Sequence, residues 1–342
     1  MKEEPRPFMA GSVSTIPGAG MAVAKGVGRE GIMEFGVHLP LLAFRGQAFS
    51  LSRLVDYAET AEQLGFTTLC ANDHLTFSRP WLDSVTALAS ILIKTPHMTL
   101  MTTVALPVVR GPVPLAKSLA ALDVLSGGHL IAGVGPGSSP QDYALAAIAF
   151  EERWKRFDES IQLLRSLLQR EVSPFRGQFY AGETTRLEPF PVQESGVPIW
   201  IGSWGSEAGL RRVARLGDGW LASAYHVTPA SFVDALARLQ RHLRQAGREP
   251  ERFPHALGSL FYYLTEDQQQ AEELLVKVVS PTLGHPVELL RERLLIGTPA
   301  ECAEKLARLQ AAGVQKVFLW PVEDETRQLA RFHEQVLPQL PQ

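Results

Sequence analysis

Short apolar runs alternate with amphipathic stretches along most of the chain, and this alternation predicts strands that are each followed by a helix. The first apolar run, FGVHLP at residues 35–40, fits a strand. After it, Leu51, Leu54 and Ala58 recur at the three- and four-residue spacing of one buried helix face, and Ser50 precedes them as a candidate N-cap. This stretch therefore predicts one strand followed by one helix.

The same unit recurs almost to the end of the chain. Seven further apolar runs fit strands, at residues 67–74, 98–106, 129–135, 198–203, 219–223, 256–264 and 316–321. Helical patterns follow them, among others near 83–94, 114–126 and 151–169. Before the last strand, Thr298, Pro299 and Glu301 form a helix N-terminus signature, and Gly313 ends that helix. Eight strands alternating with helices predict an α/β fold, a closed (β/α)8 TIM barrel.

Two stretches interrupt the period and predict insertions. Residues 174–193 alternate and contain turn residues, which indicates a hairpin, and residues 265–297 are long enough for an extra helix or a lid. Residues 1–32 are rich in glycine, proline and small side chains, and they show little periodicity. We expect them to form a flexible N-terminal extension, followed by a single barrel domain over residues 33–342.

Composition narrows the class of protein. Hydrophobic residues make up 45% of the 342 residues and charged residues 20%, as in a globular protein with a sizeable core. The net charge is -3, and no basic stripe is interleaved with aromatic residues, so we expect no nucleic-acid partner. No apolar run approaches the roughly 20 residues that span a bilayer. Cys70 and Cys302 fit neither a disulfide framework nor a metal clip, and we expect a cytoplasmic protein.

Candidate chemistry lies where the predicted strands end, because the carboxyl ends of barrel strands share one face. Asp73 and His74 follow the second strand and are suited to proton transfer near neutral pH. An aspartate that only satisfies a loop amide is the alternative. The other histidines are scattered and show no HExxH spacing, so we expect no metal site.

The glycine row GVGPGSS at residues 133–139 follows the fourth strand. A dinucleotide fingerprint would require glycine at position 138, where Ser138 stands. The pattern favours a strand end whose glycines let a flat ligand lie against the backbone, and a turn that only packs is the alternative. Residues 203–206 open a helix and are suited to bind phosphate through its free amides, although an ordinary capped helix fits these residues equally well.

Five stretches, taken together, resemble the bacterial luciferase-like monooxygenase superfamily. They are AEQLGFTTLCANDHL, LAKSLAALDVLSGGHLIAGVGPG, FEERWKRFDESIQLLRSLL, PIWIGSWGSEAGLRRVARLGDGW and IGTPAECAEKLARLQAAGV, within a match that spans Phe35 to about Pro321. The resemblance implies a (β/α)8 barrel that binds FMN or the deazaflavin coenzyme F(420), acts on a small organic substrate and forms a homodimer.

The resemblance also implies roles for individual residues. Asp73 and His74 correspond to the active-site pair, with His74 as general acid or hydrogen-bond donor, and the Thr103-Val104 peptide is expected to be cis and to lie against the ring. The residues implied to contact the cofactor are His38, Thr103, Val104, Gly135, Gly137, Ser138, Gly202, Ser203, Trp204, Gly205 and Ser206. Ser138 replaces the glutamate that some deazaflavin enzymes carry, which leaves His74 as the candidate acid.

The motifs favour the deazaflavin-using branch, and therefore an oxidoreductase that transfers a hydride to or from its substrate. One alternative is an FMN-dependent monooxygenase that inserts oxygen and needs a separate flavin reductase, because the chain shows no nicotinamide fingerprint. A catalytically silent barrel that binds a flavin and a metal-dependent hydrolase on the same fold also stay open. Trp81, Trp204, Tyr225 and Trp320 are candidates for the wall of an apolar pocket.

Overall fold

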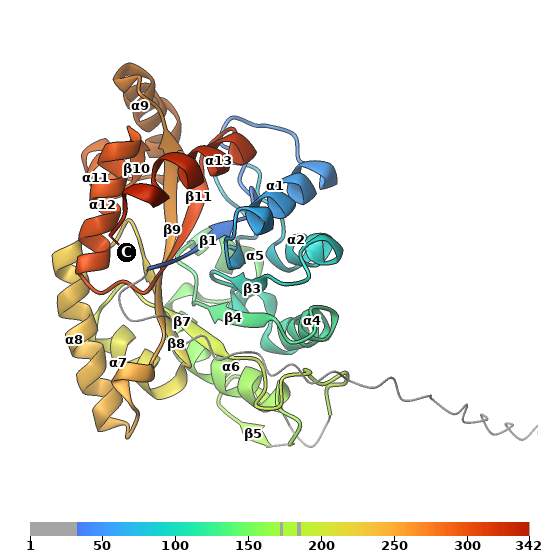
Figure 1. Cartoon of the computed structure of the whole chain (residues 1–342). Coiled ribbons are helices and arrows are strands. Elements are labelled where there is room, and N and C mark those ends of the chain that lie inside the picture. Colours follow the sequence, from blue (N-terminus) through green and yellow to red (C-terminus); the bar gives the residue numbers. More distant parts are fainter. Residues whose placement is uncertain (1–32, 172–173, 183–185, 342) are drawn as a thin grey trace, which may run out of the picture.

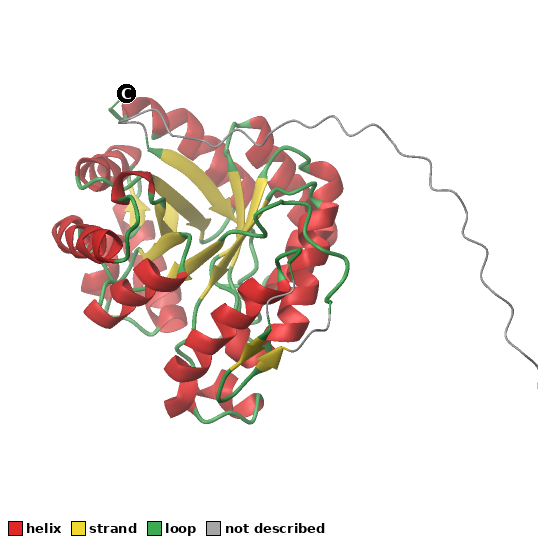
Figure 2. Cartoon of the chain, turned by 90° about the horizontal axis from the view of Figure 1, so that it is seen from below, coloured by secondary structure: helices red, strands yellow, loops and turns green. Residues whose placement is uncertain are grey.

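The chain folds around a closed barrel of parallel strands, as the alternation predicts. The computed structural model describes residues 33–171, 174–182 and 186–341, so the predicted N-terminal extension lies outside the described residues. In the described part, the eight barrel strands are β1 (Glu34–His38), β2 (Thr68–Ala71), β3 (Thr99–Thr102), β4 (Leu130–Val134), β7 (Ile199–Gly202), β8 (Gly219–Ser223), β9 (His255–Leu264) and β11 (Lys316–Pro321). Each lies within or close to a predicted run, and Figure 2 shows helices around the strands.

The strand register closes the barrel. Neighbouring strands follow the order β11-β1-β2-β3-β4-β7-β8, and β9 pairs with both β8 and β11. The outer half of β9 also pairs with a short additional strand, β10 (Leu295–Gly297). Inside the barrel, a small core packs Cys70, Met101, Trp200, Leu221, Ala256 and Phe318. The interior is therefore filled, and a ligand is confined to one end of the barrel.

Helices cover the outer face of the barrel (Figure 1). They are α1 (Leu51–Gln63), α2 (Ser84–Ile91), α3 (Pro107–Arg110), α4 (Pro112–Leu125), α5 (Pro140–Leu145), α6 (Arg153–Leu167), α7 (Glu207–Leu216), α8 (Pro229–Gln245), α9 (Gln268–Leu274), α10 (Ser280–Leu283), α11 (Val287–Arg293), α12 (Pro299–Ala311) and α13 (Glu325–Gln335). The predicted caps are confirmed, because the Ser50 hydroxyl accepts from the Arg53 amide, and Thr298 and Glu301 form a reciprocal capping box. None of the helices in the described part combines the length and apolar character that crossing a bilayer requires.

The first insertion contains the predicted hairpin, made of β5 (Phe175–Arg176) and β6 (Ala181–Gly182). Two carboxylates fasten the insertion to the barrel. Glu159 of α6 accepts from the amides of residues 178–180. The buried Asp123 of α4 accepts from the amides of Val192 and Gln193 and from the Gln193 side chain. The insertion is thus tied to two neighbouring helices.

Replacing Asp123 with alanine is expected to lower the free energy of unfolding by about 3 kcal/mol, because three buried donors lose a charged acceptor. Urea denaturation followed by circular dichroism measures this loss. The matched control is Asp56→Ala on the exposed face of α1, which should change stability by less than about 0.5 kcal/mol. Equal effects of the two substitutions would contradict a fastening role for Asp123.

The second insertion covers residues 265–297 and contains α9, a π-helical turn over Leu275–Val279, α10, α11 and β10. In Figure 1, α9 and α11 lie beyond the carboxyl end of β9. The insertion reaches the β2–α2 loop, residues 72–83, where the Ser78 hydroxyl donates to the carbonyl oxygen of Thr282 at 3.0 Å. The extra helices expected in this segment are therefore confirmed, and they contact a loop that carries candidate site residues.

Candidate active site

His74 lies at the carboxyl end of the barrel, in the β2–α2 loop, and contacts a carboxylate that is distant in the sequence. Its Nδ1 is 3.0 Å from Oδ2 of Asp142, a buried residue in the first turn of α5. The other Asp142 oxygen accepts from the Thr76 amide at 2.8 Å. A carboxylate at Nδ1 makes that nitrogen the donor, so in the neutral ring Nε2 is left as an acceptor. The pair can therefore present an oriented imidazole to a ligand.

Asp73 has a different partner, and the expected pairing of its side chain with His74 is wrong. Its carboxylate accepts two hydrogen bonds from the Arg110 guanidinium, one at 2.6 Å, and another from the Leu106 amide. Burial alone would lower the pKa of Arg110, but Asp73 and Asp83 raise it through hydrogen bonds and charge. Asp73 is only 1% exposed. It therefore fixes α3 to the β2–α2 loop, and its predicted catalytic role stays a prediction.

The glycines after β4 make room for the protein's own chain. A Cβ on Gly133 would collide with the carbonyl oxygen of Thr102, and one on Gly135 would lie 2.6 Å from the Val104 side chain. Gly137 has a φ of +79°, a conformation that favours glycine. The packing alternative therefore accounts for Gly133 and Gly135, and contact of Gly135 and Gly137 with a cofactor stays a prediction.

The segment that these glycines accommodate is the end of β3. The Thr103-Val104 peptide is cis, which confirms the expectation from the resemblance. The Thr103 hydroxyl lies 3.4 Å from Nδ1 of His38, and Nε2 of His38 accepts from the Ser259 amide at 3.3 Å. Complete burial lowers the pKa of His38 to about 3. His38 is thus a neutral ring that supports the end of β3, and its contact with a cofactor remains a prediction.

Aromatic and imidazole rings form a continuous belt across this end of the barrel, which we call the aromatic belt. Its members, each in ring contact with the next, are His74, Trp81, Trp320, Phe261 and Tyr225. The ring centroids of Trp81 and Trp320 are 5.4 Å apart, and Trp320 also stacks on His38. The indole Nε1 of Trp320 is buried and has no hydrogen-bond partner in the residues that the structure describes.

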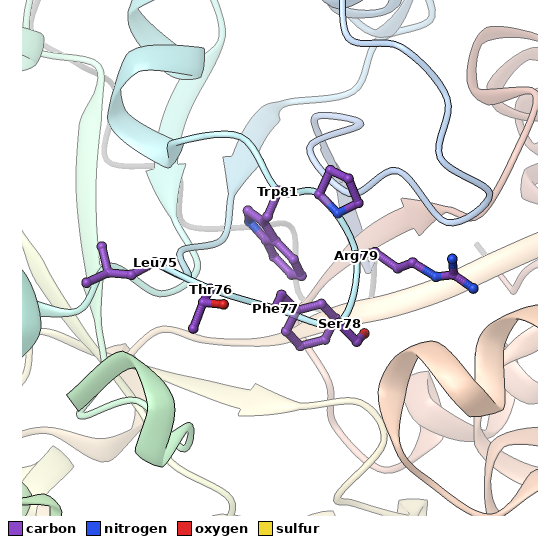
Figure 3. A pocket seen from close by; sticks show the side chains of 7 residues that line it. Leu75, Thr76, Phe77, Ser78, Arg79 and Trp81 are labelled. Atoms are coloured by element: carbon purple, nitrogen blue, oxygen red, sulfur yellow. The ribbon is translucent and has the colours of Figure 1, made fainter. Parts of the chain in front are cut away.

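A pocket of about 320 Å³ opens beside one end of the belt and is lined by residues 75–81. Figure 3 shows the rings of Phe77 and Trp81 within it, whereas the side chain of Arg79 extends away from them. Trp204, predicted as a pocket wall, is 57% exposed and stacks on His226 with ring centroids 3.7 Å apart. Trp204 therefore lies on the outer rim.

The turn at residues 202–206 ends in an N-cap, as expected. The Ser206 hydroxyl accepts from the Gly209 amide, and the Ser203 hydroxyl accepts from the Gly205 amide at 3.3 Å. The first amides of α7 have no acceptor within the helix, as at any helix N-terminus. The carboxylate of Glu207 is bound by His242 of α8 at 2.7 Å. The turn is thus suited to an anion, and its predicted contact with a cofactor phosphate remains a prediction.

Sequence reasoning missed Asp142 because its local signals indicate only a helix start. Ser139 caps α5 by accepting from the Asp142 amide, and Pro140 follows it. An acidic residue in the first helical turn is a common electrostatic preference. Its contact with His74 joins residues 68 positions apart in the sequence, which no local pattern indicates. Ser138, predicted as a donor, is exposed at the start of this loop.

Replacing Asp142 with asparagine is expected to reduce turnover about tenfold or more, because an amide no longer fixes which nitrogen of His74 carries the proton. Steady-state kinetics with the loaded enzyme measures the effect. Ser139→Ala is the control, since it weakens the start of α5 but keeps the Asp142 carboxylate. A similar loss in both variants would indicate that α5 had merely loosened.

Comparisons with known proteins cover nearly all of the barrel. The family described as luciferase-like monooxygenase matches residues 33–316. An F420-dependent glucose-6-phosphate dehydrogenase of Nakamurella multipartita is 28% identical over 328 residues, which cover 86% of this chain and 94% of the relative. An F420-dependent hydroxymycolic acid dehydrogenase of Mycobacterium tuberculosis is 26% identical, with 86% of each chain covered.

Solved structures show the same fold. An F420-dependent secondary alcohol dehydrogenase, in complex with an F420-acetone adduct, has a TM-score of 0.78 and 19% identity, with 91% of this chain and 99% of that chain covered. The monooxygenase RslO1 from Streptomyces bottropensis also has a TM-score of 0.78, with 24% identity and 90% and 99% coverage. Both likenesses are likenesses of fold.

Proposed function

Because the chain belongs to the luciferase-like monooxygenase family, we propose that it is an oxidoreductase that transfers a hydride between coenzyme F420 and a small organic substrate. The observation that carries this proposal is the similarity, over 86% of the chain, to curated dehydrogenases that are named for their dependence on F420. The runner-up is an FMN-dependent monooxygenase, which shares the fold.

The residues at the carboxyl end of the barrel fit such a cofactor. A flat ring system needs an apolar surface with a few polar groups, and the aromatic belt offers the surface. The buried indole N–H of Trp320 is a donor that a ligand oxygen would satisfy. The amides of the 202–206 turn suit a phosphate group. When bound, the deazaflavin would supply the ring carbon that takes up or releases the hydride.

The chain's own residues would handle the proton. Nε2 of His74 would accept the proton of a substrate hydroxyl, or return it to a carbonyl oxygen in the reverse direction. Asp142 would hold the imidazole in the required tautomer through Nδ1. The rings of the aromatic belt would exclude water from the reacting atoms.

The test is a titration of the purified full chain with coenzyme F420 and, separately, with FMN, following the quenching of each ring's fluorescence. Tight binding of F420 with turnover of an alcohol or a ketone is the expected result. Tight binding of FMN alone would replace the proposal by the monooxygenase alternative and would call for a separate reductase. Binding of neither would leave the silent barrel.

Three finer expectations accompany the proposal. One barrel domain over residues 33–342 is expected to form a homodimer, which sedimentation velocity at micromolar concentration would show. A reducing, cytoplasmic location agrees with two cysteines that are both buried and free. A flavin or deazaflavin reductase would regenerate the cofactor if substrate turnover consumes its reduced form.

A further inference from the structure

Three basic side chains from separate segments meet at the far end of the aromatic belt from His74. They are His226 in the loop after β8, His285 between α10 and α11, and Arg293 at the end of α11, which together we call the basic cluster. The rings of His226 and His285 have centroids 5.6 Å apart. Nη1 of Arg293 donates to the carbonyl oxygen of Tyr225 at 2.6 Å. The cluster therefore combines the end of a barrel strand with the second insertion.

The basic cluster lacks a counter-charge. Nε of Arg293 is buried and has no hydrogen-bond partner among the described residues. Within the same part of the chain, no carboxylate forms an ion pair with His226, His285 or Arg293. By contrast, Arg291 on the same helix is bound by Glu272 at 2.7 Å. Buried polar groups are normally satisfied, so the free N–H of Arg293 indicates a missing acceptor.

The surroundings of His226 disfavour its charged form. Burial, then His285 and then Arg293, lower the pKa of His226 to about 4. The groups that face it are the Ser223 hydroxyl, 3.0 Å from Nδ1, and the rings of Trp204, Tyr225 and His285. None of these carries a negative charge at neutral pH, since burial raises the pKa of the Tyr225 phenol. An arriving anion would reverse this balance by favouring the protonated imidazole.

The basic cluster lies within reach of the site around His74. The ring of Tyr225 contacts the rings of His226 and His285, and it also stacks on Phe261 of the aromatic belt. Phe261 in turn stacks on Trp320, which contacts Trp81. A substrate lying along the belt could thus place its reacting carbon near His74 and its other end at the basic cluster.

We propose that the basic cluster binds an anionic oxygen group of the substrate, a phosphate or a carboxylate, and that its imidazoles take up protons when the anion arrives. The assignment of this anion to the substrate rests on the proposed function. Arg293 would donate through Nε, and His226 would donate through Nε2 while Nδ1 remains with Ser223. The cluster would then orient the substrate and select against neutral analogues.

Isothermal titration calorimetry of the full chain at pH 7, without cofactor, tests the proposal with inorganic phosphate and with acetate as probes. Two buffers of different ionisation enthalpy report the number of protons taken up. We expect saturable binding of at least one probe with net proton uptake. Arg293→Gln should weaken that binding about tenfold or more, while His226→Asn and His285→Asn should reduce the uptake.

Arg291→Gln is the matched control, because it removes an equal charge from the same helix outside the basic cluster and should leave binding unchanged. Absence of binding overturns the proposal, as does binding that is insensitive to Arg293→Gln, which would place the anion elsewhere, for example at the 202–206 turn. Binding without proton uptake overturns the role of the imidazoles. Since the titration needs no cofactor, its outcome is separate from that of the F420 titration.

Discussion

Replacing His74 with alanine is expected to lower turnover about 100- to 10,000-fold while the fluorescence titration still reports binding of the deazaflavin. The imidazole is the group at the carboxyl end of the barrel whose Nδ1 is held by a buried carboxylate, so its loss removes the oriented proton acceptor. Single-turnover kinetics, followed by the change in cofactor absorbance, separates this loss of chemistry from any change in substrate release.

Two comparisons give this result its meaning. His97→Ala removes an exposed histidine before β3 and should leave turnover unchanged. Asp142→Asn should cause a smaller loss than His74→Ala, because it keeps the imidazole and disturbs only its orientation. Unchanged turnover in His74→Ala would refute the catalytic assignment, and loss of cofactor binding would show that His74 supports the site mainly by packing on Phe77 and Trp81.

The second large effect concerns the barrel itself. Gly133→Ala is expected to lower the free energy of unfolding by more than about 4 kcal/mol and to leave little folded protein, because the new Cβ overlaps the Thr102 carbonyl oxygen. That carbonyl belongs to the backbone of a neighbouring strand and cannot rotate away. The strands are held together there by the Thr102 hydroxyl, which donates to the Gly133 carbonyl oxygen at 2.7 Å.

Thermal unfolding followed by circular dichroism, together with the soluble yield, measures the effect. Gly258→Ala in β9 is the control, since its Cβ would meet only the end of the flexible Leu221 side chain, at 3.2 Å. We expect a loss below about 1.5 kcal/mol there. If Gly133→Ala folds as well as Gly258→Ala, the close approach of β3 and β4 does not limit stability.

The elements of the barrel were predictable because their signals are local. The apolar run at 219–223 coincides with β8, and the residues from Thr298 to Glu301 mark the start of α12 in the sequence as clearly as in the structure. Such signals depend on hydrogen bonds and burial within a few residues. They do not depend on how the barrel closes.

The partners of the site residues were not predictable, because they are chosen by the closure of the barrel. Asp73 stands beside His74 in the sequence, yet Arg110 binds the one and Asp142 the other. Both contacts cross from the second strand's loop to later loops. A sequence shows which side chains can form ion pairs but not which of them meet.

The glycines after β4 illustrate a related limit. Their spacing correctly indicates that something approaches the backbone closely, because only glycine leaves that space. The sequence does not say whether a ligand or the chain itself fills it. At Gly133 and Gly135, the end of β3 does so.

The bond between Ser78 and Thr282 has a consequence for the traffic of small molecules. It joins two loops at the open end of the barrel that are 204 positions apart in the sequence. A single neutral hydrogen bond contributes only about 1 kcal/mol, close to thermal energy. Parting these loops breaks none of the pairings between barrel strands. Exchange of molecules with bulk solvent is thereby uncoupled from the durability of the scaffold, so selection for heat resistance in the strands need not slow turnover.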